Sequence, residues 1–345
     1  MDTQRHQSLR QSHSEKYFYM NSQRHAAGIT GLGSYLPERI LTNKEMESFV
    51  DTTDDWIQSR TGIKERRVAA DDQFTLDLAH EAAKAALADA NVTADQVDLI
   101  IVATSTADYR FPSTASLLQN RLGSTCAAFD LGAACSGFVY GLNTAAQFVM
   151  AGSAQTVLVV GAEIMTRIVD WNDRTTCVLF GDGAGAAVLQ RVPEGYGVLG
   201  IDMGSDGSGG ELLKVECSIT NGNADARRYI VQNGREVYRF AVNKLGESAL
   251  QALQNCNIDP VEIDLFVPHQ ANLRIIDAAA KRLELPSEKV FCDLEKYGNT
   301  SAASVPIALC EAHRQNRIQH DDLIVMVGFG AGLTWASCVM KWYAP

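Results

Sequence analysis

The chain has 345 residues, enough for one large domain or two of ordinary size, and its composition of 46% hydrophobic and 21% charged residues is typical of a soluble globular protein. A net charge of −11 argues against nucleic acid as the main partner, and no apolar run is long enough to cross a membrane. The eight cysteines show neither a CxxC pair nor metal-ligand spacing, so we expect reduced thiols, no metal site and a cytoplasmic location.

Residues 1–27 are polar and lack the apolar core of a secretory signal, so they predict a disordered N-terminal extension, with Met20 as an alternative start. The remainder divides into two halves, residues 28–193 and 194–345, because the pattern of strands and helices restarts after Pro193.

The first half alternates strand and helix patterns. Strands are expected over 29–36, 97–104, 127–131, 156–160, 177–180 and 184–189. Helices are expected over 43–50, 76–90 and 113–122 and from Cys135 to about Gly152, and residues 54–63 are expected to form a polar loop.

The second half repeats this alternation. Strands are expected over 198–203, 263–267, 290–294, 323–327 and 333–340, and helices over 237–253, 273–283 and 301–313. Residues 205–226 are rich in Gly, Asn and Ser and predict a surface excursion, and Asn233-Gly234 predicts a turn.

The two halves echo each other in sequence, which predicts an internal duplication of a βαβ-containing unit. The matching pairs are 97–103 with 263–268, 128–130 with 291–293, 157–161 with 323–328, and 182–188 with 329–335. In this register Cys135 and Asn299 occupy equivalent turns, each opening a helix. A pseudo-twofold axis between the halves would bring these two residues together, with His269 nearby.

Cys135 stands where a buried strand ends and a helix begins, and the unpaired N–H groups of a helix N-terminus stabilise a thiolate. We therefore expect a lowered pKa for this thiol. Taken singly, Cys135 could be an inert core residue, His269 a structural histidine and Asn299 a helix cap. The duplication that aligns them favours a functional site.

Four motifs carry a family resemblance: Gly-Ala-Ala-Cys-Ser-Gly-Phe at 132–138, Phe-Gly-Asp-Gly-Ala-Gly-Ala at 180–186, Pro-His-Gln-Ala-Asn at 268–272 and Gly-Asn-Thr-Ser-Ala-Ala-Ser-Val-Pro at 298–306. From about Ile29 to the C-terminus the chain resembles the thiolase-like condensing enzymes, specifically β-ketoacyl-acyl carrier protein synthase III. Elongating synthases carry a second His in place of Asn299, and thiolases carry a second Cys. The resemblance implies an α/β protein with a five-layered αβαβα fold of two duplicated halves, a homodimer and no cofactor.

The resemblance also implies a reaction, the decarboxylative condensation of a short acyl-CoA with malonyl-acyl carrier protein. Acetyl-CoA is the acyl-CoA expected first. This step initiates type II fatty-acid synthesis. Cys135 would take the acyl group as a thioester, and His269 and Asn299 would donate hydrogen bonds to the malonyl thioester carbonyl. The backbone N–H groups of Cys135 and Ala331 would form the oxyanion hole, although family members often have Gly at the position of Ala331.

Further binding residues follow from the same resemblance. Trp56, Arg60 and Arg174 match the residues that hold the coenzyme A nucleotide, and an aromatic face with guanidinium groups suits adenine and phosphate. Phe111 matches a residue that reaches across a dimer interface and forms the bottom of the acyl pocket. The alternative is that Phe111 simply packs in the core.

A basic helical face is predicted at 273–283, because Arg274, Lys281 and Arg282 are spaced i, i+7 and i+8. Arg239 joins them by resemblance. In an acidic protein such a face suits an acidic carrier-protein partner, and a solvated charged surface is the alternative.

Three rival functions remain. The first is a synthase-III-like condensing enzyme or acyltransferase of secondary metabolism with a different acyl donor. The second is a papain-like hydrolase, which uses Cys, His and Asn in the same chain order, with a spacing that Cys135 and His269 satisfy. Against it, the local cysteine motif of that family is absent and the internal repeat is unexplained. The third, a non-catalytic binding paralogue, is disfavoured because all three polar groups are present.

Overall fold

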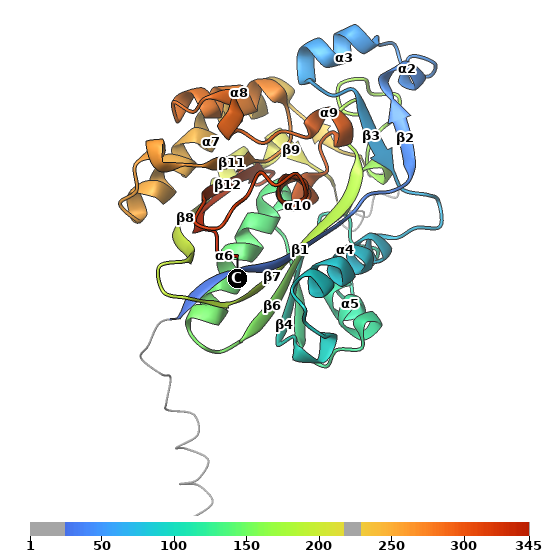
Figure 1. Ribbon diagram of the computed structural model, residues 1–345. Coiled ribbons are helices and arrows are strands. Elements are labelled where there is room, and N and C mark those ends of the chain that lie inside the picture. Colours follow the sequence, from blue (N-terminus) through green and yellow to red (C-terminus); the bar gives the residue numbers. More distant parts are fainter. Residues whose placement is uncertain (1–24, 217–228, 345) are drawn as a thin grey trace, which may run out of the picture.

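Two mixed β-sheets organise the chain in the computed structural model, which describes residues 25–216 and 229–344 (Figure 1). The first sheet has the order β1 (Ala26–Tyr35), β7 (Asp182–Val192), β6 (Thr156–Ile164), β4 (Leu99–Ala103) and β5 (Ala127–Leu131). The second has the order β11 (Leu265–Pro268), β12 (Leu323–Gly330), β13 (Thr334–Lys341) and β8 (Gly197–Ser205). The parallel pairs are β4 with β5, β4 with β6 and β11 with β12; the other neighbours are antiparallel.

Helices cover both sheets and fill the space between them, which confirms the predicted five layers. In Figure 1, α4 (Thr75–Asp89) and α5 (Thr114–Leu122) lie at the lower right, and α7 (Gly234–Asn255) and α8 (Leu273–Arg282) lie at the upper left. Between them lie α6 (Gly137–Met150) and α10 (Ser304–Arg314). Most side chains of α6 and α10 are buried, as expected for helices between two sheets, whereas α7 and α8 bury only a stripe.

The predicted duplication is confirmed by the sheet topology. Strands β1, β7, β6 and β4 of the first sheet correspond in order and direction to β8, β13, β12 and β11 of the second. The chain passes from one sheet to the other between the end of β7 and the start of β8, on either side of residue 193. The counterpart of β5 is reduced, within the described residues, to one parallel bridge between Phe266 and Val290.

Three of the four edges of the two large sheets have neighbours within the described chain. The edges β1 and β8 meet at the start of both strands, where a Cβ on Gly197 would lie 2.1 Å from the carbonyl oxygen of Ala27. The β11 edge carries the Val290 bridge. The outer edge of β5 has no neighbouring strand among the described residues, and Ala127 and Phe129 on that strand are exposed.

A small hairpin lies beside the two sheets, and it contains a helix that the sequence analysis missed. The hairpin consists of β2 (Arg39–Thr42) and β3 (Glu65–Val68), connected through α2 (Asn43–Met46) and α3 (Asp54–Thr61). The prediction of a polar loop over 54–63 is therefore wrong. Thr53 caps α3 by accepting a hydrogen bond from the backbone N–H of Trp56, and Gly62 ends the helix at φ 85°.

Three other predicted elements are wrong. Residues 177–180 form a turn followed by a single bridge from Phe180 to Asn299, and their apolar side chains pack under the hairpin. Residues 290–294 hold only the Val290 bridge and the start of α9 (Leu294–Tyr297). Asn233 caps α7 by accepting from the backbone N–H of Glu236, so Asn233-Gly234 begins a helix instead of making a hairpin turn.

Two predictions fall partly outside the described residues. Residues 26–27 belong to β1 and not to a disordered extension, whereas 1–24, including Met20, lie outside the described part. The excursion predicted over 205–226 contains a 3₁₀ helix (Gly207–Leu212) and β9 (Leu213–Lys214), which pairs with β10 (Val231–Gln232), and its remainder from 217 on is not described. None of the helices in the described residues is long and apolar enough to span a membrane.

Candidate active site

Cys135 is buried in a tight 3₁₀ turn (Ala134–Ser136) between β5 and α6. The end of β12 packs directly on this turn. A Cβ on Gly330 would lie 2.6 Å from the backbone nitrogen of Cys135, so no side chain can be accommodated there without moving the backbone. The glycine therefore allows the second half of the chain to fix the position of the Cys135 backbone.

A matching 3₁₀ turn (Ser301–Ala303) opens α10. Ser301 has φ 50° and Ala134 has φ 45°, so the first residues of the two turns correspond. This register places Cys135 opposite Ala302, while Asn299 precedes its turn. The prediction that Cys135 and Asn299 are equivalent positions is therefore wrong in register, although the two turns do meet.

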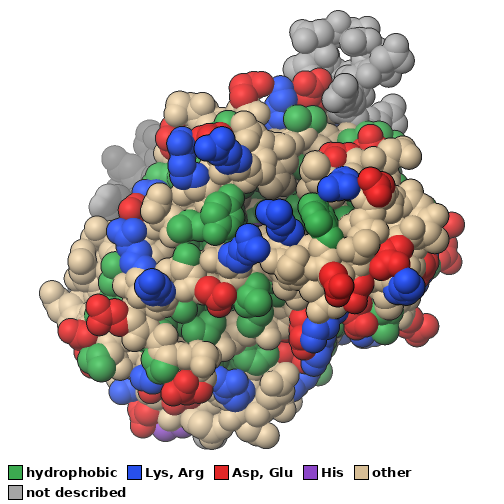
Figure 2. Space-filling view, turned by 90° about the horizontal axis from the view of Figure 1, so that it is seen from above, with side chains coloured by type: hydrophobic (Ala, Val, Ile, Leu, Met, Phe, Trp, Pro, Cys, Tyr) green, Lys and Arg blue, Asp and Glu red, His purple; other side chains and the backbone are tan. Residues whose placement is uncertain are grey.

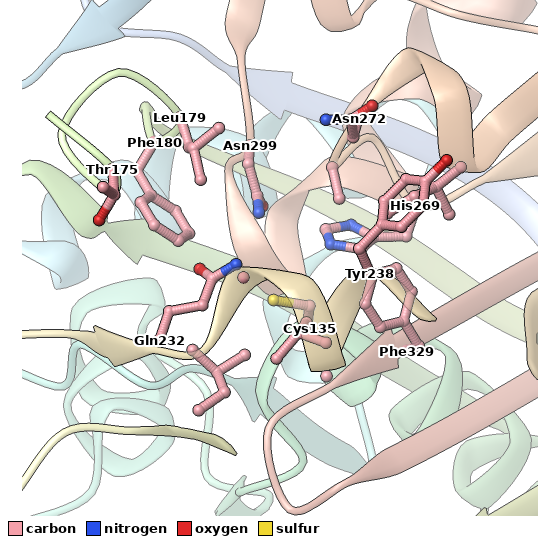
Figure 3. A pocket seen from close by; sticks show the side chains of 16 residues that line it. Cys135, Thr175, Leu179, Phe180, Gln232, Tyr238, His269, Asn272, Asn299 and Phe329 are labelled. Carbon is pink, nitrogen blue, oxygen red and sulfur yellow. The ribbon is translucent and has the colours of Figure 1, made fainter. Parts of the chain in front are cut away.

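His269 and Asn299 approach Cys135 from the second half of the chain. His269 follows β11; its backbone N–H donates to the carbonyl of Val327 (2.7 Å), and its Nδ1 lies 2.5 Å from the hydroxyl oxygen of Ser304. The side-chain oxygen of Asn299 accepts from the backbone N–H of Ser301 (2.8 Å). Figure 3 shows the Asn299 amide nitrogen and the His269 ring pointing into the space beside the Cys135 sulfur.

Burial sets the protonation state of this site. Burial raises the pKa of the Cys135 thiol to about 12; a hydrogen bond to Ser301 opposes the rise and the charge of Glu163 adds to it. The predicted lowering of this pKa is therefore wrong for the resting site, because desolvation of the thiolate outweighs the helix N-terminus. Burial lowers the pKa of His269 to about 3, so the imidazole is neutral at pH 7.

Two cavities meet at Cys135. One, of about 200 Å³, has mainly apolar walls, but it contains the side chains of His269 and Asn299 and is called the polar cavity for these two groups. The other, of about 260 Å³, has mainly apolar walls, formed by Met165, Ile168, Phe180, Leu213, Val215 and Ile230. The sulfur can thus reach an apolar chamber on one side and hydrogen-bond donors on the other.

Ala331, the second predicted oxyanion residue, also lines the apolar cavity. The hydroxyl of Thr334 donates to the carbonyl oxygens of both Ala331 and Ala133, each at 3.1 Å. This shared contact holds the backbone of Ala331 beside the turn that carries Cys135. Its role in an oxyanion hole remains a prediction.

The three residues predicted to bind coenzyme A do not line the polar cavity, but they contact or adjoin residues that do, Asn272 and Thr175. The guanidinium of Arg174 stacks on the Trp56 ring, 4.9 Å from its centroid, and donates to the backbone carbonyl of Asp51 (2.9 Å). The backbone carbonyl of Arg60 accepts from the side chain of Asn272 (3.0 Å), which itself lines the cavity. An aromatic face and two arginines thus stand close to the polar cavity; that they bind coenzyme A remains a prediction.

Phe111 lies in the loop between β4 and α5 and is 82% exposed. Its neighbour Tyr109 is 58% exposed, and Phe111 lines neither of the two cavities of its own chain. The alternative that Phe111 simply packs in the core is therefore wrong.

The four predicted docking residues fall into two groups. Arg274, at the start of α8, donates to the carbonyl of Ser59 (2.7 Å), and neither it nor Lys281 pairs with an acidic side chain among the described residues. By contrast, Arg282 pairs with Glu247 (3.3 Å) and Arg239 pairs with Glu236 (2.5 Å). Figure 2, which looks down on α3 and α8, shows several Lys and Arg side chains gathered near the middle of this face.

The sequence analysis missed three polar residues of the site: Ser301 beside the sulfur, Glu163 behind Ser301, and Ser304 beside His269. The Cys135 sulfur lies 3.4 Å from the Ser301 hydroxyl oxygen, which in turn contacts Glu163. One signal was available, because Glu163 is the only charged residue in the otherwise apolar run that forms β6. A lone charge in a buried strand is uncommon enough to suggest a function.

Comparison with known proteins places these features in one family. Residues 129–207 match 3-Oxoacyl-[acyl-carrier-protein (ACP)] synthase III, and residues 253–342 match the C-terminal part of the same family. The chain is 54% identical over 324 residues to a β-ketoacyl-[acyl-carrier-protein] synthase III from Caldanaerobacter subterraneus subsp. tengcongensis, covering 92% of this chain and 98% of that relative.

Solved structures agree. A β-ketoacyl-[acyl carrier protein] synthase III from Thermus thermophilus is 49% identical with a TM-score of 0.88, over 92% of this chain and all of the other. The priming β-ketosynthase of the R1128 polyketide biosynthetic pathway is 37% identical with a TM-score of 0.89, over 94% of this chain and 98% of the other.

Proposed function

The chain belongs to the β-ketoacyl-acyl carrier protein synthase III family, and on that premise we propose that it condenses an acyl-CoA, acetyl-CoA first of all, with malonyl-acyl carrier protein. The products are 3-oxoacyl-acyl carrier protein, coenzyme A and CO₂, and the reaction initiates type II fatty-acid synthesis. One observation carries the proposal: a buried thiol, an imidazole and an amide converge where two mainly apolar cavities meet, one of which contains the imidazole and the amide.

In the first half-reaction Cys135 attacks the thioester carbonyl of acyl-CoA. Coenzyme A leaves, and the acyl chain occupies the apolar cavity. The backbone N–H groups of Cys135 and Ala331 stabilise the tetrahedral oxyanion. A typical donor of this kind lowers the activation free energy by about 3 kcal/mol. The nucleotide end of coenzyme A binds at Trp56, Arg60 and Arg174.

In the second half-reaction the malonyl thioester carbonyl lies between His269 and Asn299. When the Ser304 hydroxyl donates to Nδ1 of His269, the proton of the neutral imidazole stands on Nε2, which faces the cavity. Loss of CO₂ concentrates negative charge on the thioester oxygen, so these donors bind the enolate more tightly than the substrate. The carbanion then attacks the acyl group on Cys135.

Both substrates carry a pantetheine arm, so one opening serves them in turn and the kinetics are ping-pong. Arg274, which contacts Ser59 of α3, and Lys281, Arg239 and Arg282 provide positive charge for an acidic carrier protein. The remaining expectations, a cytoplasmic homodimer that needs no cofactor, belong to the same proposal.

A second candidate function uses the same chemistry with another acyl donor in secondary metabolism. The likeness to the priming ketosynthase of a polyketide pathway favours it. A papain-like hydrolase is ruled out because the fold is a duplicated five-layered one.

Intact-mass measurement tests the proposal. The protein is incubated with acetyl-, isobutyryl- and hexanoyl-CoA, and malonyl-acyl carrier protein is then added. We expect one acyl group per chain, which is lost on condensation. Cys135→Ala should take up none, whereas Cys292→Ala, which removes an exposed cysteine, should label normally. Labelling of another cysteine would contradict the assignment, and the donor that labels fastest separates the two candidate functions.

A further inference from the structure

A carboxylate with no role in the reaction outlined above is buried behind the nucleophile. Glu163, on β6, has no exposed surface. It accepts hydrogen bonds from the hydroxyl of Thr106 (2.6 Å), the hydroxyl of Ser301 (3.0 Å) and the backbone N–H of Ser105 (3.0 Å). No basic side chain of the described residues forms an ion pair with it. A buried carboxylate surrounded only by neutral donors can exchange a proton.

Two hydrogen bonds connect this carboxylate to the reacting sulfur. The Cys135 thiol donates to the Ser301 oxygen (3.4 Å), and the Ser301 hydroxyl donates to Oε1 of Glu163 (3.0 Å). Both bonds run in the same direction, from sulfur to carboxylate. They form a continuous path for a proton across the seam between the two halves of the chain.

The thiol needs an acceptor for its proton, and His269 is poorly suited. Its Nδ1 is engaged by Ser304, and burial lowers its pKa to about 3. Burial raises the pKa of Glu163 to about 7, close to the value that suits proton exchange at neutral pH. The negative charge of Glu163 also disfavours a thiolate at Cys135. This repulsion disappears when the proton moves from the thiol to Glu163, because the carboxyl group is then neutral.

We propose that Ser301 and Glu163 form a proton relay for Cys135. As the sulfur attacks the acyl-CoA carbonyl, the thiol proton passes to the Ser301 oxygen and the Ser301 hydroxyl proton passes to Oε1 of Glu163. The carbon–sulfur bond to Cys135 forms, and the carbonyl oxygen takes the negative charge. When the tetrahedral intermediate collapses, the bond to coenzyme A breaks, and the proton returns through Ser301 to the departing sulfur.

Ser301 contacts the reacting atom and is thus a catalytic residue, whereas Glu163 acts through Ser301 and is a positioning residue that holds the proton. This assignment rests on the proposed function. Among the described elements packed around Glu163, the titratable groups are Cys135 on the nucleophile turn and Asp182 on β7. Asp182 is occupied elsewhere, by the backbone N–H of Ala69 and by Thr166.

The test compares the pH dependence of single-turnover acylation, measured by intact mass with acetyl-CoA, in the parent, Glu163→Gln and Ser301→Ala. The parent rate should rise with pH through a midpoint near 7, because only ionised Glu163 accepts the proton. At neutral pH each variant should be slower by about 10²-fold or more, and its rate should climb toward alkaline pH without that midpoint. The double variant should be no slower than the slower single one, since the residues act as one unit.

Asp182→Asn is the matched control, because it removes a buried carboxylate from the adjacent strand whose pKa is also raised, to about 6. It should keep the parent midpoint. If Glu163→Gln does not fold, Ser301→Ala tests the relay by itself, because in that variant Glu163 keeps its other hydrogen-bond donors and stays in place. Variants that melt earlier but keep the parent rate and pH profile would show that these contacts are merely structural and would overturn the relay.

Alkylation of Cys135 by iodoacetamide separates failure of the relay from failure of the proposed function. If the parent takes no acyl group from any acyl-CoA, the proposed function fails. The relay still predicts an inflection near neutral pH in the alkylation profile of the parent, absent from both variants. A pH profile of parent alkylation without that inflection would contradict the proposed relay.

Discussion

Asn299 is held so that only one of its side-chain atoms is free for substrate. Its side-chain oxygen accepts from the backbone N–H of Ser301, and its own backbone is paired with Leu179 and Gly181. The amide nitrogen therefore points into the polar cavity beside Cys135 (Figure 3). Asn299 lines this cavity and not the second one, so under the proposed function it serves the enolate and not the acyl group.

Asn299→Ala should leave acylation by acetyl-CoA near the parent rate while condensation falls by about 10²–10³-fold, the usual effect of losing one oxyanion donor. Two single-turnover measurements check this: label retained on the protein from acetyl-CoA, and CO₂ released from malonyl-acyl carrier protein. Asn120→Ala, on the exposed surface of α5, should change neither. Parent-rate decarboxylation by a protein that cannot be acylated would reverse the assigned roles.

Sequence reasoning at this scale found the residues that stand in recognisable motifs: Cys135, His269 and Asn299. It missed Ser301 and Glu163 because their meaning depends on distances between segments remote in the chain. It also gave the wrong direction for the Cys135 pKa, since a strand–helix junction indicates a helix N-terminus but not how deeply the thiol is buried.

At the scale of elements, one arginine holds the hairpin that carries Trp56 and Arg60. Arg66, on β3, is fully buried, and its guanidinium donates to the carbonyl of Val178 (2.7 Å), to the side-chain oxygen of Asn43 (2.8 Å) and to the carbonyl of Leu41 (3.2 Å). Burial lowers its pKa to about 10, which still leaves it charged at pH 7. These bonds fasten the hairpin to the segment just before β7.

Arg66→Met should lower the melting temperature, because each buried acceptor left without a donor costs about 1–3 kcal/mol. The KM for acyl-CoA should rise more than kcat falls, since the change loosens the nucleotide site and spares the catalytic groups. Arg39→Met, on the exposed strand of the same hairpin, is the control and should affect both little. An Arg66→Met protein with parent stability and KM would contradict this role for the hairpin.

The elements themselves were only partly predictable. The signals for α3 were all present: Thr53 as a cap, Asp54 and Asp55 in the first turn, and Gly62 just past the end. Residues 177–180 and 290–294 misled for another reason. An apolar run shows that a segment is buried, but its periodicity over four or five residues cannot distinguish a strand from a turn packed under a hairpin.

At the scale of the whole molecule, the duplication was readable from the sequence because both halves kept the residues that end their strands. The register was not, since the backbone angles of Ala134 and Ser301 decide it. Those angles pair Cys135 with Ala302, so the catalytic groups are not symmetry mates. The two-fold scaffold brings together the turns that open α6 and α10. The site itself depends on the residues that differ between the two halves, such as Cys135 and its counterpart Ala302.

Phe111→Arg should convert the proposed homodimer into a monomer and slow acylation, because the exposed aromatic side chain is expected to enter the partner's acyl pocket. Size-exclusion chromatography with light scattering measures the first effect, and intact mass after acetyl-CoA measures the second. Val261→Arg, at an apolar position that is 75% exposed in the other half, should leave both unchanged. A Phe111→Arg protein that keeps the oligomeric mass of the parent would contradict a role for Phe111 at the dimer interface.

The unequal sheet edges limit how copies of the chain can join. A protein with two free, complementary edges can add subunits without end and form filaments. Of the four edges of the two large sheets in the described chain, β1 and β8 meet near Gly197 and β11 carries the Val290 bridge, so β5 is the edge without a neighbour. If two copies pair through β5, as the proposed homodimer allows, each uses the one uncovered edge of its large sheets, and those sheets add no third copy.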